Sequence, residues 1–198
     1  MAKFHTKRFE KEIAKTLRSQ AIKERARIVA EDKVRSAHKE MLQDFDTHPV
    51  TREINSGPEG TNLSGTLGGY GNLFSYIGFN RGSQPTTSIR NYLEKQVHVF
   101  KEPRVFKVTG GAIYSFRLTT PNLETIQAMT PSPWENRSWI KGLETGISGL
   151  GFYLFSRKDD FDTRSESGIQ KTQQLRSLSF KPIKYMSSIL DKFYKNTR

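Results

Sequence analysis

The chain has 198 residues, of which 34% are hydrophobic, and a formal net charge of +12 at pH 7. This length fits one domain, or one domain with extensions, and the low hydrophobic content predicts that part of the chain orders against partners. The charge favours a polyanion or an acidic protein surface as partner. Because there is no cysteine, a disulfide framework, a thiolate zinc site and a cysteine nucleophile are excluded.

We expect neither a secretory leader nor a membrane span. The first residues are charged and lack the apolar stretch of a signal peptide. No run of the sequence approaches the roughly 18 apolar residues that a transmembrane helix needs.

Residues 1–47 are predicted to form a helical extension. Apolar residues recur at helical spacing, as in Phe9, Ile13 and Leu17 and again in Val34, Ala37 and Met41. The sequence Thr47-His48-Pro49 predicts the end of the helix, since a residue before proline avoids the helical region. Two interpretations stay open: the helix packs on its own core, or it packs against sister subunits.

Residues 48–95 combine a glycine-rich stretch with a short helix predicted at residues 86–95. Seven of the fifteen glycines lie within residues 48–79, together with large apolar side chains. Glycine allows close approach of another chain, whereas leucine and aromatic side chains need a surface to bury against. We therefore expect residues 55–82 to be mostly extended coil, ordered by the sheet or by other subunits. The candidate inter-subunit contacts are Ile13, Leu17, Met41, Leu67, Tyr70, Leu73, Phe74 and Phe79.

Residues 96–198 are predicted to form an α+β core. Residues 96–119 are rich in Val, Phe, Tyr and Thr and contain Gly110-Gly111, which predicts a β-hairpin. Thr120 and Pro121 predict the N-cap and the first residue of a short helix.

A buried strand is predicted at residues 152–155 and a closing helix at residues 183–196. The predicted fold class is α+β. It comprises a long N-terminal helix, an extended glycine-rich segment, and a small antiparallel sheet with short helices and a C-terminal helix.

No motif for catalysis or for a cofactor stands out. The glycines from Gly65 to Gly71 lack the spacing and the lysine of a phosphate-binding loop. The four histidines lack metal-ligand spacing, and Ser148 misses the spacing of a G-x-S-x-G elbow. We therefore expect no enzymatic activity, no metal and no cofactor.

Basic and aromatic residues alternate along the predicted hairpin. This pattern can form a stacking platform for single-stranded nucleic acid, but the interpretation we favour is a half-buried hairpin with a solvated outer face. The candidate contacts with a DNA backbone are Arg104, Lys107 and Arg117. No base-reading motif accompanies them.

Three stretches together resemble virion structural proteins of tailed phages with contractile tails. They are HPVTREINSGPEGTNLSGTLGGYGNLFSYIGF, RSWIKGLETGISGLGFYLFS and RSESGIQKTQQLRSLSFKPIKYMSSILDKF. The arrangement is similar to head–tail connector, or tail-completion, proteins, in which an N-terminal helix leads to a segment of the type Pro-Val-x-Thr-Gly-x-Leu. Here Pro49-Val50-Thr51 and Gly65-Thr66-Leu67 stand in for that segment, with an insertion between them.

The resemblance implies a structural subunit of the phage neck or tail, in a closed ring that joins the portal-side rings to the tail. The implied partners are other copies of the chain, the portal or adaptor, the tail tube or terminator, and packaged DNA without sequence preference. The implied location is the virion, and the host cytoplasm during assembly. The alternative hypothesis is a basic nucleic-acid-binding protein, either single-strand-binding or ribosome-associated.

Overall fold

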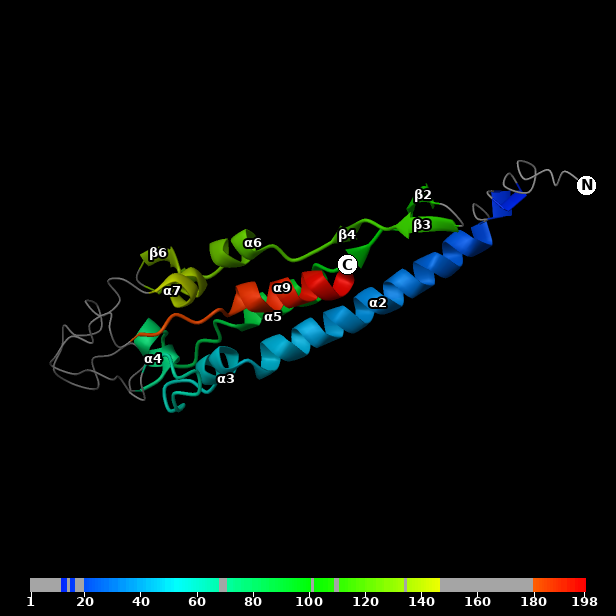
Figure 1. The fold of residues 1–198 in the computed structure, drawn as a ribbon. Coiled ribbons are helices and arrows are strands. Elements are labelled where there is room, and N and C mark those ends of the chain that lie inside the picture. The colour runs from blue at the N-terminus through cyan, green and yellow to red at the C-terminus, as the bar shows by residue number, and fades with distance from the viewer. Residues whose placement is uncertain are drawn as a thin grey trace, which may run out of the picture.

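A computed structural model describes residues 12–13, 15–16, 20–67, 71–100, 102–108, 111–133, 135–146 and 180–198 of the chain. The fold class is α+β, as predicted, with a long N-terminal helix, short helices, two-stranded antiparallel sheets and a C-terminal helix. The described part is elongated (Figure 1). Helix α2 (Gln20–Thr47) runs along it, with a β-hairpin near its N-terminal half and the other helices around its C-terminal half.

Helix α2 ends at the predicted position, and helix α3 (Pro49–Asn55) follows at once. His48 is the N-cap of α3: the backbone N–H of Val50 donates to its Nδ1 at 3.2 Å. Pro49 occupies the first position of α3, where the missing N–H costs no hydrogen bond. The chain therefore changes direction at Thr47-His48-Pro49 and not within either helix.

Four further described helices lie outside the glycine-rich segment. They are α5 (Thr87–Lys95), α6 (Leu123–Ala128), α7 (Trp139–Thr145) and α9 (Met186–Thr197). The prediction for the start of α6 is wrong, because its N-cap is Asn122 and not Thr120. The side chain of Asn122 accepts the N–H of Glu124 at 2.8 Å, and asparagine is at least as good an N-cap as threonine.

Most described residues of the glycine-rich segment lie in loops and turns, and the segment folds onto helices of its own chain. This corrects the prediction that only the sheet or other subunits order it. Helix α4 (Leu73–Ile77) lies within it and is buried throughout. The side chain of Asn72 caps α4 by accepting the N–H of Ser75 at 2.9 Å. Gly78 ends the helix with a φ of 82°, a left-handed conformation that favours glycine.

The side chain of Glu53 in α3 binds the backbone of the glycine-rich segment. Its carboxylate is fully buried. One oxygen accepts the N–H of Leu73 and the other the N–H of Ser64, each at 2.7 Å. Burying a carboxylate is costly unless hydrogen bonds compensate it, and here the backbone of the glycine-rich segment supplies them.

The described strands pair as three antiparallel sheets of two strands each. These are β1 (His98–Val99) with β4 (Leu118–Thr119), β2 (Arg104–Val108) with β3 (Gly111–Ser115), and β5 (Pro131–Ser132) with β6 (Glu135–Ser138). The first two sheets form one long hairpin, joined by a hydrogen bond from Phe100 N–H to the carbonyl of Arg117 at 2.9 Å. We call residues 98–119 the hairpin arm. The strand predicted at residues 152–155 lies outside the described residues.

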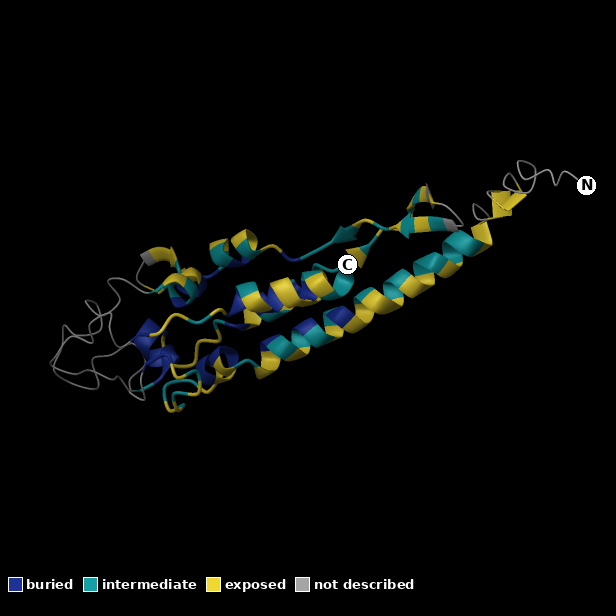
Figure 2. Cartoon of the chain, in the orientation of Figure 1, coloured by how far each residue is buried: buried dark blue, intermediate teal, exposed yellow. Residues whose placement is uncertain are grey.

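One core gathers buried side chains from all three segments that the sequence suggested. It lies where α3, α5 and α9 meet the C-terminal half of α2 and extends to α4 and α7, and Figure 2 shows the buried residues concentrated there. In α2 the buried residues are Ala37, Met41 and Phe45. The N-terminal half of α2 and the hairpin arm carry mostly exposed and half-buried residues (Figure 2).

Candidate interaction surface

Most of the predicted inter-subunit contacts lie inside the chain. Met41, Leu67, Leu73, Phe74 and Phe79 are buried in the core of their own chain. Little surface of these side chains is left for a neighbouring subunit, so their role as inter-subunit contacts stays a prediction that the fold does not favour.

The other three predicted contacts have different outcomes. Ile13 is 41% exposed and stays available for a contact. Leu17 and Tyr70 lie outside the described residues.

A cleft of about 580 Å³ separates the N-terminal half of α2 from strand β3, and we call it the apolar groove. One wall is a stripe along α2 and the other is formed by two aromatic side chains of the hairpin arm. The lining residues are Ala21, Ile22, Arg25, Ala26, Val29, Ala30, Lys33, Tyr114 and Phe116. The sequence interpretation missed this groove, although Ile22, Ala26 and Val29 follow helical spacing.

The opposite face of the hairpin arm is apolar and open to solvent. Phe106 and Ile113 are cross-strand partners, and each is more than half exposed. Val108, on the same face, is 46% exposed. Together they form an outer apolar face, and among the described residues no third strand pairs with β2 or β3. Two-stranded hairpins are marginally stable alone, so this arm is suited to packing against another surface.

Two of the predicted DNA-contacting residues are brought together near the base of the arm. Arg104 and Arg117 line a cleft of about 430 Å³ with Phe100, Glu102, Ser115 and Phe116. The guanidinium of Arg117 lies 5.6 Å from the centre of the Phe100 ring, a cation–π contact. The side chain of Lys107 lies outside the described part of the structure. Phe116 lines both this arginine cleft and the apolar groove.

Four cations line the two clefts. Arg25, Lys33, Arg104 and Arg117 form no ion pair with any described residue. On the same helix, in contrast, Arg27 pairs with both Glu24 and Glu31. The positive charge near the clefts is therefore available to a partner.

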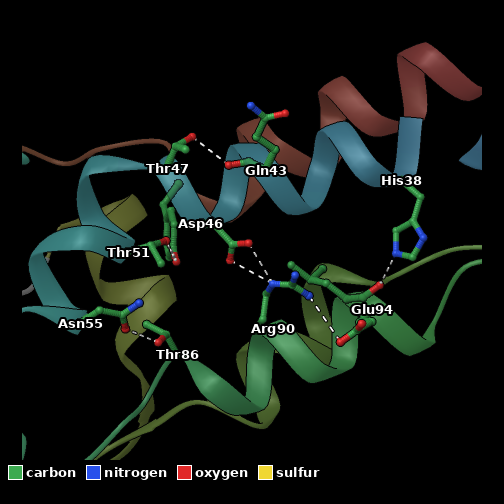
Figure 3. A network of polar contacts seen from close by, with 11 residues as sticks. His38, Gln43, Asp46, Thr47, Thr51, Asn55, Thr86, Arg90 and Glu94 are labelled. Carbon is green, nitrogen blue, oxygen red and sulfur yellow. Dashed lines mark hydrogen bonds and ion pairs between the residues drawn. The ribbon is translucent and has the colours of Figure 1, made fainter. Parts of the chain in front are cut away.

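Carboxylates around the core mostly face a cation of the same chain. Lys192 lies 2.8 Å from Glu40 and 2.7 Å from Asp44. Arg90 lies 2.9 Å from Asp46 and also reaches Glu94, as Figure 3 shows. These pairs hold α9 and α5 against α2 and leave little acidic surface there.

The remaining polar contacts near α2 fix the fold. Figure 3 shows His38 of α2 directed at the backbone of α5, with its Nε2 at 3.0 Å from the carbonyl of Leu93. Thr51 and Tyr185 share a buried hydrogen bond of 2.6 Å, and burial raises the pKa of Tyr185. Burial also lowers the pKa of His48, which favours the neutral imidazole that acts as an N-cap acceptor.

The described residues contain no group of three His, Asp or Glu side chains arranged to hold a metal ion. Within the same residues, no helix combines the length and the apolar character that crossing a membrane requires. Comparison of the chain with family models, with curated proteins and with solved structures found no match.

Proposed function

We propose that the chain is a structural subunit of a phage neck or tail ring, a head–tail connector or tail-completion protein that joins the portal-side rings to the tail. On this proposal it acts by assembly and not by catalysis, in the virion after assembly in the host cytoplasm. Its partners are other copies of the chain, neighbouring neck and tail proteins, and packaged DNA through its phosphate backbone.

The observation that carries this proposal is the outer apolar face of the hairpin arm. Exposed large apolar side chains that lie together mark interaction sites, and Phe106, Val108 and Ile113 do so on an arm away from the core. A contact between the arm of one copy and a different surface of the next copy would be head-to-tail. Such contacts close into rings when the rotation between copies allows it.

The test is the assembly state of the purified protein, read by electron microscopy and native mass spectrometry. We expect closed rings for the wild type and their loss in Phe106→Asp, because a charge cannot be buried in an apolar contact without a partner. Leu63→Asp is the matched control: Leu63 is 43% exposed but lies outside the arm. A monomeric wild type, or rings that persist in Phe106→Asp, would contradict the proposal.

A second candidate function is non-specific binding of single-stranded nucleic acid. The arginine cleft favours it, because Phe100 can stack on a base while Arg104 and Arg117 contact phosphates. Tight binding with a steep salt dependence, lost in Arg104→Ala/Arg117→Ala, would favour this function over the structural one. Weak binding that is independent of sequence fits the structural subunit.

A further inference from the structure

We propose that the apolar groove between α2 and the hairpin arm binds an acidic amphipathic helix of another protein. This deepens the proposed function, because it names the chemistry of the neighbouring virion protein that the subunit would hold. The groove lies on the face of the arm opposite the outer apolar face, since Tyr114 alternates with Ile113 along β3. The two surfaces can therefore be tested separately.

The groove lies along the same face of α2 against which another helix of the chain packs further toward the C-terminus. Helix α9 packs against the C-terminal half of α2, with Asn196 donating to the carboxylate of Glu40 at 2.9 Å. N-terminal to this region, the same stripe of α2 continues from Lys33 to Ala21 and lines the groove. A helix in the groove would thus extend the layer that α9 begins.

The shape and chemistry of the walls favour a helix over a strand. On α2, Ala21, Ala26 and Ala30 are small, which lets another helix approach closely. Tyr114 and Phe116 are two residues apart, so they present one face of the hairpin arm to the groove and not its edge. A strand needs an edge for its backbone hydrogen bonds, whereas a helix satisfies its own. The α2 wall runs from Ala21 to Lys33, which corresponds to a helix of about 12 residues, or roughly 18 Å.

The charges favour an acidic partner over a second copy of this chain. Arg25 and Lys33 line the groove without an ion pair to any described residue. Residues 20–36 and 98–119 together hold nine Lys or Arg and four Asp or Glu, so two such surfaces would repel each other. The carboxylates around the core are largely paired already. Nucleic acid fits poorly, because phosphates would leave the apolar walls uncovered.

The test uses the full-length protein and a labelled synthetic peptide of about 14 residues, with leucine at helical i, i+3, i+4, i+7 spacing and glutamate on the remaining face. The comparison peptide has lysine in place of every glutamate. Fluorescence anisotropy should show that the acidic peptide binds at least about tenfold more tightly than the basic peptide. Reversing the groove charges in Arg25→Glu/Lys33→Glu should invert this preference.

Two adjacent positions on α2 provide a matched pair of variants. Val29 is 62% exposed and lines the groove, while Ile28 is 45% exposed and does not. Val29→Asp should weaken binding of the acidic peptide by about tenfold or more, because it places a carboxylate among apolar walls and opposite a like charge. Ile28→Asp should change it by less than about twofold. Circular dichroism should show the same helix content for both variants.

Equal binding of the two peptides, no binding of either, or equal effects of the two α2 variants would overturn the proposal. If a single-stranded oligonucleotide displaced the acidic peptide, the groove would be assigned to nucleic acid instead. If the free protein self-associated and Val29→Asp abolished that self-association, the groove would be assigned to a second copy of the chain. Ring assembly should survive Val29→Asp, and peptide binding should survive Phe106→Asp, so the failure of either proposal is recognisable without the other.

Discussion

Removing the carboxylate of Glu53 tests whether the chain itself, and not a neighbouring subunit, orders the glycine-rich segment. Glu53→Ala leaves the buried N–H of Leu73 and the partly buried N–H of Ser64 without their acceptor. A hydrogen bond to a charged group contributes about 1.5–3 kcal/mol, and a buried donor left alone costs a similar amount. Because water can reach Ser64, the full cost applies to Leu73 and part of it to Ser64.

We therefore expect Glu53→Ala to lower the free energy of unfolding by about 3 kcal/mol. For a domain of this size that corresponds to a fall in Tm of about 6–12 °C. Thermal unfolding followed by circular dichroism measures the fall. Hydrogen exchange should show that the amides of α4 lose protection first, while those in the C-terminal half of α2 keep theirs.

The control for this change is Glu59→Ala. Glu59 forms an exposed ion pair with Arg81, and exposed pairs contribute at most about 1 kcal/mol. The reasoning is refuted if the two variants unfold at the same temperature, or if the exchange rate of the Leu73 amide in Glu53→Ala equals that of the wild type. Either result would mean that contacts other than the carboxylate hold the segment.

Two further predictions concern single caps in the fold. The wild type should lose stability as the pH falls from about 6.5, the ordinary histidine pKa, toward the lower folded-state pKa of His48, because the unfolded chain binds the proton more readily. His48→Asn keeps an N-cap acceptor without titrating, so its unfolding free energy should vary less between pH 7 and 5 in denaturant titrations. Gly78→Ala places a side chain at a φ of 82°, so urea unfolding should report a loss of about 1–2 kcal/mol.

The elements that could be predicted from sequence carry strong local signals. The end of α2 follows from Thr47-His48-Pro49, because proline restricts the residue before it whatever the tertiary context. The hairpin follows from β-branched and aromatic residues on both sides of Gly110-Gly111. Helix α9 follows from apolar spacing within residues 183–196.

The glycine-rich segment could not be predicted in the same way, because its order depends on a distant residue. Local caps for α4 exist in Asn72 and Gly78, but they flank only five residues, too few for an apolar period to indicate a helix. The buried carboxylate that accepts hydrogen bonds from the segment belongs to Glu53, which is 20 residues from Leu73 along the chain. Charged side chains are almost never fully buried, so no pattern would assign this carboxylate to the interior.

Core and interaction surface could not be separated from sequence because both use the same residue types at the same spacing. Along α2 one stripe passes from Ile22 and Ala26 in the groove to Met41 and Phe45 in the core. What distinguishes its two halves is how closely the described elements opposite pack against it: α9 packs against the C-terminal half, whereas a groove remains between the N-terminal half and the hairpin arm. Among the described residues, an apolar groove stays open beside two cations, Arg25 and Lys33, that have no ion pair, and a partner of opposite charge can complete this combination.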